Sequence, residues 1–272
     1  MSSTVQRKLW EGKLPVCFTL PEHEVSTTAT STEPLKPLYL LVPRVSYLPL
    51  LKRKILEHFS VYIDVDKCED LWFEYNGVPL KWNYPTGVLY DMQSHSSCDL
   101  PWCVTVHFQS FPKDKLLACT TEEQIKWHFF STLKEADYLK HKGEIMANMS
   151  QDNHSKLWYG LKTDNFEQFW SLNKTFMEGH QGTGFFHSVP VRVYYGERVL
   201  QKRITISPEQ TSVLTLREVL KLVNENLFDD PKLTSLRLIL HGVSLPLHTE
   251  IQWLSENLSY PDNFVHICIS DL

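Results

Sequence analysis

A twelve-residue segment occurs twice in this chain in similar form. Residues 71–82 read LWFEYNGVPLKW, and residues 236–247, which lie 165 positions later (236 − 71), read LRLILHGVSLPL. Each copy has a β-rich run, a two-residue Asn-Gly or His-Gly turn, and a second short extended run. Because glycine tolerates the positive φ that a tight hairpin turn needs, both copies are predicted to be β-hairpins.

The elements around the two copies also repeat. Before each hairpin the sequence shows two strand patterns and then an amphipathic helix, and after it a short helical region and a last strand. The first set is predicted at 16–20, 38–42, 48–59 and 102–108, and the second at 189–195, 199–206, 214–227, 251–258 and 264–269. This β-β-α-β-β-β order is that of the ubiquitin-like β-grasp fold, so two such domains are predicted. One larger α+β domain is the alternative.

The segment between the repeats is predicted to be helical. In the first helix, at about 121–139, apolar residues recur every three or four positions, and Thr120 with Glu123 fits a capping box. A shorter stretch around Leu157 and a helix that starts at Asp164 follow. Polar segments at 21–37 and 179–184 are predicted to be a loop and a linker.

The fold class is therefore predicted as α+β, with two ubiquitin-like β-grasp domains flanking a helix-rich middle domain. Residues 1–9 are expected to form a helical N-terminal segment. The first ubiquitin-like domain is assigned to 10–112, the helix-rich domain with its linkers to 113–184, and the second ubiquitin-like domain to 185–272.

Composition excludes several classes of function. The 27 Lys and Arg against 32 Asp and Glu give a net charge of −5, so no strong positive field attracts nucleic acid. The longest uncharged runs are shorter than the roughly 18 residues of a membrane-spanning helix, and the first residues contain no apolar signal segment. We therefore expect a cytoplasmic protein that does not bind nucleic acid.

The sequence contains no motif typical of a catalytic, cofactor-binding or metal-binding site. The six cysteines include no C-x-x-C pair, and Cys98 with Cys103 has no second Cys or His pair at zinc-ligand spacing. The histidines show no H-x-x-x-H spacing, and there is no G-x-S-x-G or Gly-rich phosphate loop. No catalytic residue, cofactor or metal is predicted, and the cysteines are expected to be reduced.

Two features bear on a role in ubiquitin-like conjugation. Modifiers are activated at a flexible C-terminal glycine, but this chain ends with Ser270, Asp271 and Leu272, so we expect that its tail is not donated. Lys134, in the first predicted helix, points about 160° from the mean direction of the apolar stripe and should be exposed. On periodicity alone, Lys134 is a solubilising surface charge.

Six longer strings resemble the autophagy protein 5 family. They are VPRVSYL at 42–48, WFEY at 72–75, PLKWNYP at 79–85, KEAD at 134–137, LKHK at 139–142 and QWLSENLSYPDNF at 252–264. The similarity runs from about Trp10 to Ile267. The family is built of two ubiquitin-like domains flanking a helix-rich one, in agreement with the repeated pattern.

The resemblance implies a site and a set of partners. Lys134, the lysine of KEAD, would carry an isopeptide bond to the C-terminal glycine of autophagy protein 12, formed by activating and conjugating enzymes that bind transiently. A groove between the domains would hold the N-terminal helix of autophagy protein 16. Arg44 is our candidate for a polar anchor in that groove, and its alternative is a surface charge at a strand end.

The implied function is that of a non-catalytic scaffold. The conjugate would act like a ligase that promotes transfer of autophagy protein 8 relatives onto phosphatidylethanolamine at the autophagosome precursor membrane. The basic residues 52–54 either make a weak peripheral contact with anionic lipid or simply form the solvated face of a helix. A cysteine-dependent transferase and an unconjugated ubiquitin-like adaptor are the alternative functions.

Overall fold

The computed structural model describes residues 2–26, 34–68, 70–93, 100–179, 184, 186–206, 213–226 and 228–271. Much of the predicted loop at 21–37 and most of the predicted linker at 179–184 lie outside these residues, as do Cys98 and Leu272. The chain divides into two compact units, which are described separately. One comprises Gly12–Tyr90 and Ser97–His128, and the other Met1–Glu11, Asp91–Ser96 and Phe129–Leu272.

The first unit contains a five-stranded sheet in the order β2-β1-β5-β3-β4. Its central strands β1 and β5 are parallel, and the other pairs are antiparallel. The strands are β1 (Lys13–Thr19), β2 (Leu38–Pro43), β3 (Trp72–Tyr75), β4 (Val78–Pro79) and β5 (Trp102–His107). The helical elements are η1 (Glu22–Glu24), η2 (Leu48–Leu51), α2 (Lys52–Phe59), η3 (Val65–Lys67) and α3 (Thr86–Met92), of which α3 ends beyond the unit boundary.

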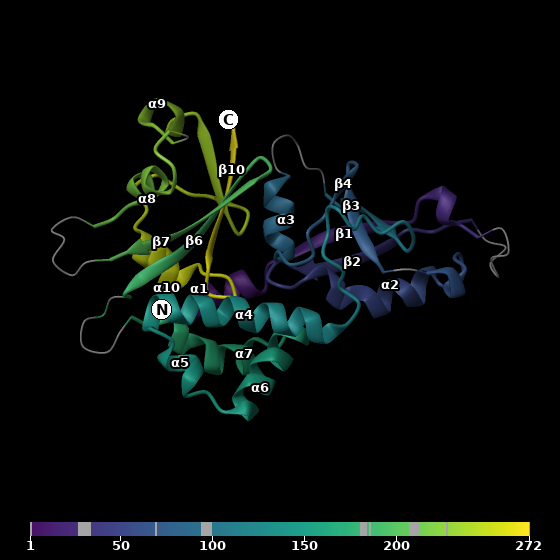
Figure 1. Cartoon of the computed structure of the whole chain (residues 1–272), viewed down its shortest axis with the longest axis horizontal. Coiled ribbons are helices and arrows are strands. Elements are labelled where there is room, and N and C mark those ends of the chain that lie inside the picture. Colours follow the sequence, from purple (N-terminus) through teal and green to yellow (C-terminus); the bar gives the residue numbers. More distant parts are fainter. Residues whose placement is uncertain are drawn as a thin grey trace. The chain divides into compact units, whose positions relative to one another are not determined.

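The core of this unit lies between the sheet and α2 (Figure 1). Alternate residues of β1, such as Val16 and Phe18, are fully buried with Ile55 and Phe59 of α2. Burying each such side chain contributes roughly 1.5–3 kcal/mol, so this interface carries much of the unit's stability. The helix predicted at 48–59 begins as a 3₁₀ turn that contains Pro49 and becomes α-helical at Lys52.

The second unit contains a sheet of the same topology, in the order β7-β6-β10-β8-β9. Again the first and last strands, β6 and β10, are parallel neighbours at the centre. The strands are β6 (Ser188–Tyr195), β7 (Arg198–Thr205), β8 (Leu236–Leu240), β9 (Val243–Ser244) and β10 (Val265–Asp271). The helices that lie between its strands in sequence are α8 (Leu216–Val223), α9 (Asp230–Leu233) and α10 (Ile251–Asn257). The prediction of two ubiquitin-like β-grasp sheets is confirmed.

The two repeated segments form matching hairpin turns. Asn76 and Gly77 have φ of 49° and 78°, and His241 and Gly242 have φ of 53° and 79°. Two successive positive φ values characterise the type I′ turn that joins antiparallel strands. A Cβ added at Gly77 would meet no heavy atom within 4 Å, so the backbone conformation and not the available space favours glycine there.

The middle of the chain is helical, as predicted. Its helices are α4 (Glu122–His141), α5 (Glu144–Ala147), α6 (Gln151–Lys162), α7 (Phe166–Asn173) and the 3₁₀ turn η4 (Lys174–Met177). The N-terminal helix α1 (Ser2–Trp10) packs beside α7, and the ring centres of Trp10 and Phe169 lie 4.8 Å apart. Gln6 of α1 also donates to the carbonyl of Glu256 on α10.

Two helix starts differ from their predicted positions by one residue. At α4 the side chain of Gln124, not Glu123, accepts the backbone N–H groups of Thr120 and Thr121. At α7 the cap is Asn165, whose side chain accepts the N–H of Gln168. At each helix the predicted and the observed capping residues are polar neighbours that satisfy the same capping rule, and the tertiary fold selects between them.

Gly160 marks a close approach between α6 and α7. A Cβ built at this glycine would lie 2.8 Å from the backbone nitrogen of Phe169. Replacing Gly160 with alanine is expected to lower the free energy of unfolding by ~1–3 kcal/mol, although alanine favours an isolated helix. Urea denaturation would measure this, with Ser155→Ala, at an exposed position of α6, as the control. Equal or higher stability of Gly160→Ala would contradict the close contact.

Candidate functional site

Lys134 lies on the solvent face of α4. Its side chain is exposed, whereas Leu133 and Ala136 on the opposite face are fully buried. Tyr138, one turn further along, is also exposed. Among the described residues, no hydrogen bond or ion pair engages the Lys134 ammonium. The exposure predicted from helical periodicity is therefore confirmed, and its amine is accessible to another protein.

The residues beside Lys134 hold this part of α4 in place. Glu135 accepts a hydrogen bond of 2.6 Å from Gln201 of β7 and lies 3.6 Å from the Arg192 guanidinium of β6. Asp137 is fully buried, and its carboxylate accepts the backbone N–H of Met146 at 2.8 Å. Burial raises the pKa of Asp137, with the backbone hydrogen bonds opposing this effect. The accessible amine of Lys134 thus extends from a backbone segment that these contacts hold in place.

Lys140, also on α4, is in the opposite situation. Its side chain is fully buried, and its ammonium donates to Asn263 Oδ1 at 3.1 Å and to the carbonyl of Phe176 at 3.4 Å. Burial lowers the pKa of Lys140 to about 7. Burial of Lys140 can be inferred from the sequence, because this residue follows Leu133 by seven positions and therefore lies on the same, buried face of the helix. An acyl-transfer enzyme cannot reach this amine.

A second buried network, formed by Tyr194, His266 and Asp262, includes a carboxylate whose charge acts on Lys140. His266 of β10 binds the Asp262 carboxylate at 2.9 Å, and the Tyr194 hydroxyl lies 2.8 Å from the other ring nitrogen. Burial alone would raise the pKa of Asp262, but His266 and then Arg192 outweigh this and lower it. Arg192 thus lies between Asp262 and Glu135 of α4.

Arg44, the candidate anchor for a partner helix, follows β2 and is largely buried. Only 9% of the residue is exposed, so the alternative of a surface charge at a strand end is wrong. Its guanidinium donates to the carbonyl of Gly87 at 3.4 Å and lies 5.8 Å from the centre of the Tyr90 ring. These contacts orient the side chain from within the domain. Its role toward a partner helix remains a prediction.

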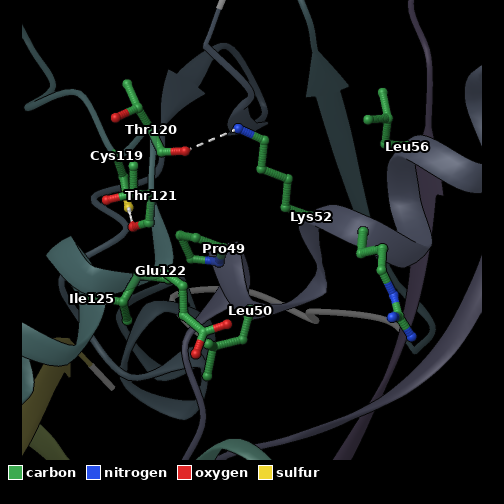
Figure 2. A pocket seen from close by; sticks show the side chains of 10 residues that line it. Pro49, Leu50, Lys52, Leu56, Cys119, Thr120, Thr121, Glu122 and Ile125 are labelled. Atoms are coloured by element: carbon green, nitrogen blue, oxygen red, sulfur yellow. Dashed lines mark hydrogen bonds between the residues drawn. The ribbon is translucent and has the colours of Figure 1, made fainter.

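A cavity of about 340 Å³ lies between η2, α2 and the chain that enters α4 (Figure 2). The Lys52 ammonium donates to the Thr120 carbonyl across it at 3.3 Å, and the Cys119 thiol points toward the Thr121 carbonyl. Burial raises the pKa of Cys119 to about 11, so the thiol is protonated near neutral pH and is a poor nucleophile. The cavity therefore lacks an activated cysteine.

Three of the other four described cysteines are buried or partly buried. Cys17 and Cys268 are buried, and burial raises the pKa of Cys68. Cys103 is exposed. None of these described residues forms a disulfide.

The basic residues of α2 differ in their freedom. Arg53 and Lys54 are exposed, and Arg53 forms an ion pair of 3.5 Å with Glu57. Lys52 is half-buried and held by Thr120. In the part of the chain that the structure describes, no helix combines the length and the apolar character needed to cross a membrane.

Comparison with protein-family models assigns all three parts of the chain. Residues 9–108 match the model described as Autophagy protein ATG5, UblA domain. Residues 122–179 match its alpha-helical bundle region, and residues 188–269 match its UblB domain. These matches follow the order of the two sheets and the helices between them.

Two curated relatives are similar in sequence to this chain over nearly its full length. Autophagy protein 5 of Drosophila melanogaster is 37% identical over 97% of this chain and 96% of its own length. Autophagy-related protein 5 of Caenorhabditis elegans is 36% identical over 99% of this chain and 98% of its own. The crystal structure of Kluyveromyces marxianus Atg5 shares the fold, with a TM-score of 0.80, 20% identity and coverage of 98% and 99% of the two chains. This chain therefore belongs to the autophagy protein 5 family and has a role in autophagy.

Proposed function

We propose that this chain accepts the ubiquitin-like autophagy protein 12 through an isopeptide bond at Lys134 and then acts as a scaffold. The observation that carries the proposal is the exposed amine of Lys134 on a helix whose neighbouring residues are held by buried and cross-strand contacts. A positioned, solvent-facing amine suits attack on a thioester that a separate enzyme presents.

The scaffold part of the proposal concerns two further partners. The N-terminal helix of autophagy protein 16 docks through its apolar face, and the assembled conjugate stimulates a separate enzyme to lipidate autophagy protein 8 relatives with phosphatidylethanolamine. This chain performs no bond-making step itself. The raised pKa values of Cys68 and Cys119 argue against a nucleophilic thiol at these two positions, because thiolates and not thiols are nucleophiles.

Reconstitution tests this function against its two alternatives. With the family's activating and conjugating enzymes, autophagy protein 12 and ATP, we expect a heavier species of this chain that survives reducing agent. A thioester intermediate would instead disappear on reduction, which would favour a cysteine-dependent transferase. No heavier species would favour an unconjugated adaptor. A chain with every cysteine replaced by serine should still form the adduct and support lipidation.

A weak contact between α2 and anionic lipid is part of the same proposal. Each basic residue near such a surface contributes ~1 kcal/mol, so exchanging Lys52 and Lys54 for glutamate should weaken vesicle binding by more than about tenfold. Sedimentation with anionic and with neutral vesicles measures this. The matched control replaces Lys202 and Arg203, which are exposed on β7, by glutamate. Unchanged sedimentation of the α2 variant would remove the membrane contact from the proposal.

A further inference from the structure

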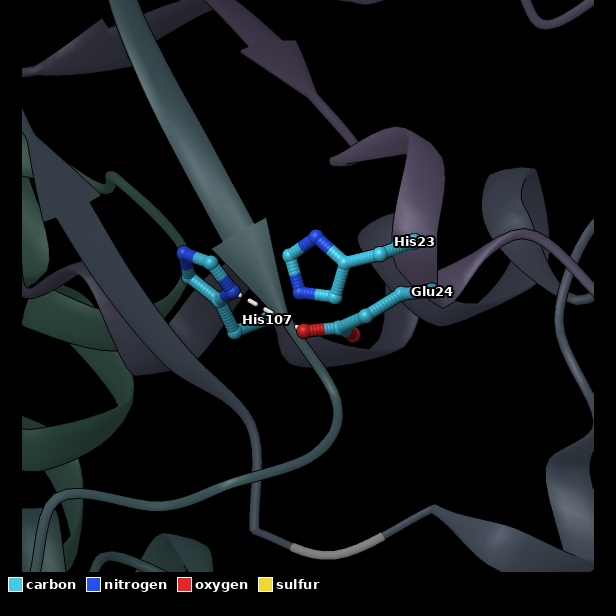
Figure 3. A group of neighbouring side chains, drawn as sticks. All are labelled: His23, Glu24 and His107. Carbon is cyan, nitrogen blue, oxygen red and sulfur yellow. Dashed lines mark hydrogen bonds and ion pairs between the residues drawn. The ribbon is translucent and has the colours of Figure 1, made fainter.

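Three potential metal ligands converge in the first ubiquitin-like domain. His23 and Glu24 lie on η1, and His107 is the last residue of β5 (Figure 3). One ligand atom from each residue lies within 4.8 Å of the other two. His107 is more than eighty positions from the others in sequence, so only the fold brings this group together. The proposed conjugation function does not use it.

The carboxylate of Glu24 is buried and oriented. Only 3% of Glu24 and 7% of His107 are exposed. One carboxylate oxygen, Oε2, accepts the backbone N–H of Phe108 at 2.7 Å. The other, Oε1, lies 2.9 Å from His107 Nδ1. Because the backbone holds Oε2, Oε1 is directed at the imidazole nitrogen and is available as an oxygen ligand.

His107 has the surroundings of a metal-ligating histidine. Its ring stacks on Trp72, with ring centres 3.9 Å apart and planes inclined by 10°. Its far nitrogen, Nε2, lies 3.5 Å from the Glu74 carboxylate on β3. Nε2 has no hydrogen-bond partner among the described residues, so Glu74 would have to move closer to bond it. Histidines that bind a metal usually direct their second nitrogen to such a carboxylate, which fixes the tautomer and leaves the first nitrogen as ligand. Here that first nitrogen, Nδ1, is the one that faces Glu24.

His23 completes the group from the solvent side. Its side chain is exposed, and its ring centre lies 6.4 Å from that of His107. In the described part of the chain, no hydrogen bond engages its imidazole. Rotation of this side chain onto an ion therefore breaks no contact of that kind. The set of two imidazoles and one carboxylate is typical of Zn²⁺ sites that keep one open position.

We propose that His23, Glu24 and His107 bind one Zn²⁺ ion and that Glu74 positions His107. Zn²⁺ ligand distances of about 2.0–2.2 Å require the ligand atoms to lie closer together than 4.8 Å, so the exposed His23 side chain would have to rotate toward the other two. The ion takes the place of the hydrogen bond between Glu24 and His107, and any proton that Nδ1 carries is released to solvent. It would tie η1 to the end of β5.

The test is a Zn²⁺ titration of the full-length chain against a competing chelator, monitored by calorimetry. We expect one ion per chain, and a dissociation constant raised by at least about tenfold in His23→Ala, a substitution at an exposed position. Zn²⁺ should also raise the melting temperature of the wild type, and raise that of His23→Ala by less, because it binds the folded state. His248→Ala, at an exposed histidine of the second ubiquitin-like domain, should retain wild-type affinity.

Two further variants separate this ligand set from other groups. Glu74→Gln should weaken binding by about 10–100-fold, as expected for a residue that orients a ligand. Cys68→Ser should leave Zn²⁺ affinity unchanged. This thiol is a useful control because the Glu24 charge is the second cause, after burial, of its raised pKa. Wild-type chain that binds no Zn²⁺ at micromolar concentration would overturn the proposal. So would unchanged affinity in His23→Ala, or a loss confined to His248→Ala or Cys68→Ser.

Discussion

Replacement of Lys134 by arginine is expected to abolish the reductant-resistant adduct in the reconstituted conjugation reaction. Arginine keeps the positive charge and exposure of the side chain but stays protonated at all accessible pH values, so its guanidinium does not attack a thioester. The side chain makes no hydrogen bond or ion pair among the described residues, so folding should be unaffected. Densitometry of a reducing gel measures the effect.

The matched control for this experiment is Lys142→Arg. Lys142 is exposed and lies eight residues beyond Lys134, just after α4 ends. The Lys142→Arg protein should form the adduct at the wild-type rate. Together with loss of the adduct in Lys134→Arg, this result would show that the enzyme selects one position and does not use any accessible amine near this helix. Undiminished adduct on the Lys134→Arg protein would refute the site, although the chain would remain a conjugation acceptor.

The second large effect concerns the buried Lys140. Because burial lowers its pKa to about 7, and the unfolded chain has an ordinary lysine pKa near ~10.4, the unfolded state binds more protons between these two values. The free energy of unfolding contributed by this residue therefore rises with pH from about 7 upward, by up to roughly 1 kcal/mol per pH unit. Below about pH 7 both states are protonated and the contribution is constant.

Lys140→Met should remove this dependence. We expect the stability of the wild type, measured relative to the variant, to increase between about pH 7 and 9 and to be flat below that range. Urea denaturation at several pH values measures both chains, with the exposed Lys142→Met as a control that retains the wild-type slope. Parallel stability curves for wild type and Lys140→Met would show that Lys140 is not a buried amine with a lowered pKa.

The sequence predicted the elements whose signals are local. The Asn-Gly and His-Gly turns were found because a two-residue hairpin loop demands positive φ, and the structure shows that conformation in both. Lys134 was placed in solvent because helical periodicity fixes which side faces the core. The repeated order of strands and helices was then sufficient to predict both sheets.

Features that depend on tertiary contacts were not predicted. The group formed by His23, Glu24 and His107 joins residues that are distant in sequence, and no spacing motif links them. The buried state of Arg44 depends on Gly87 and Tyr90, which approach it only in the folded domain. The helix caps were displaced by one residue because neighbouring polar residues satisfy the same local rule.

The position of β7 has a consequence for self-association. This strand is the outermost of its sheet, and it presents Arg198, Lys202 and Arg203 to solvent. An unpaired outer strand is a template for another chain, but two copies aligned there would bring cationic side chains together. Repulsion of this kind disfavours polymerisation through the second sheet.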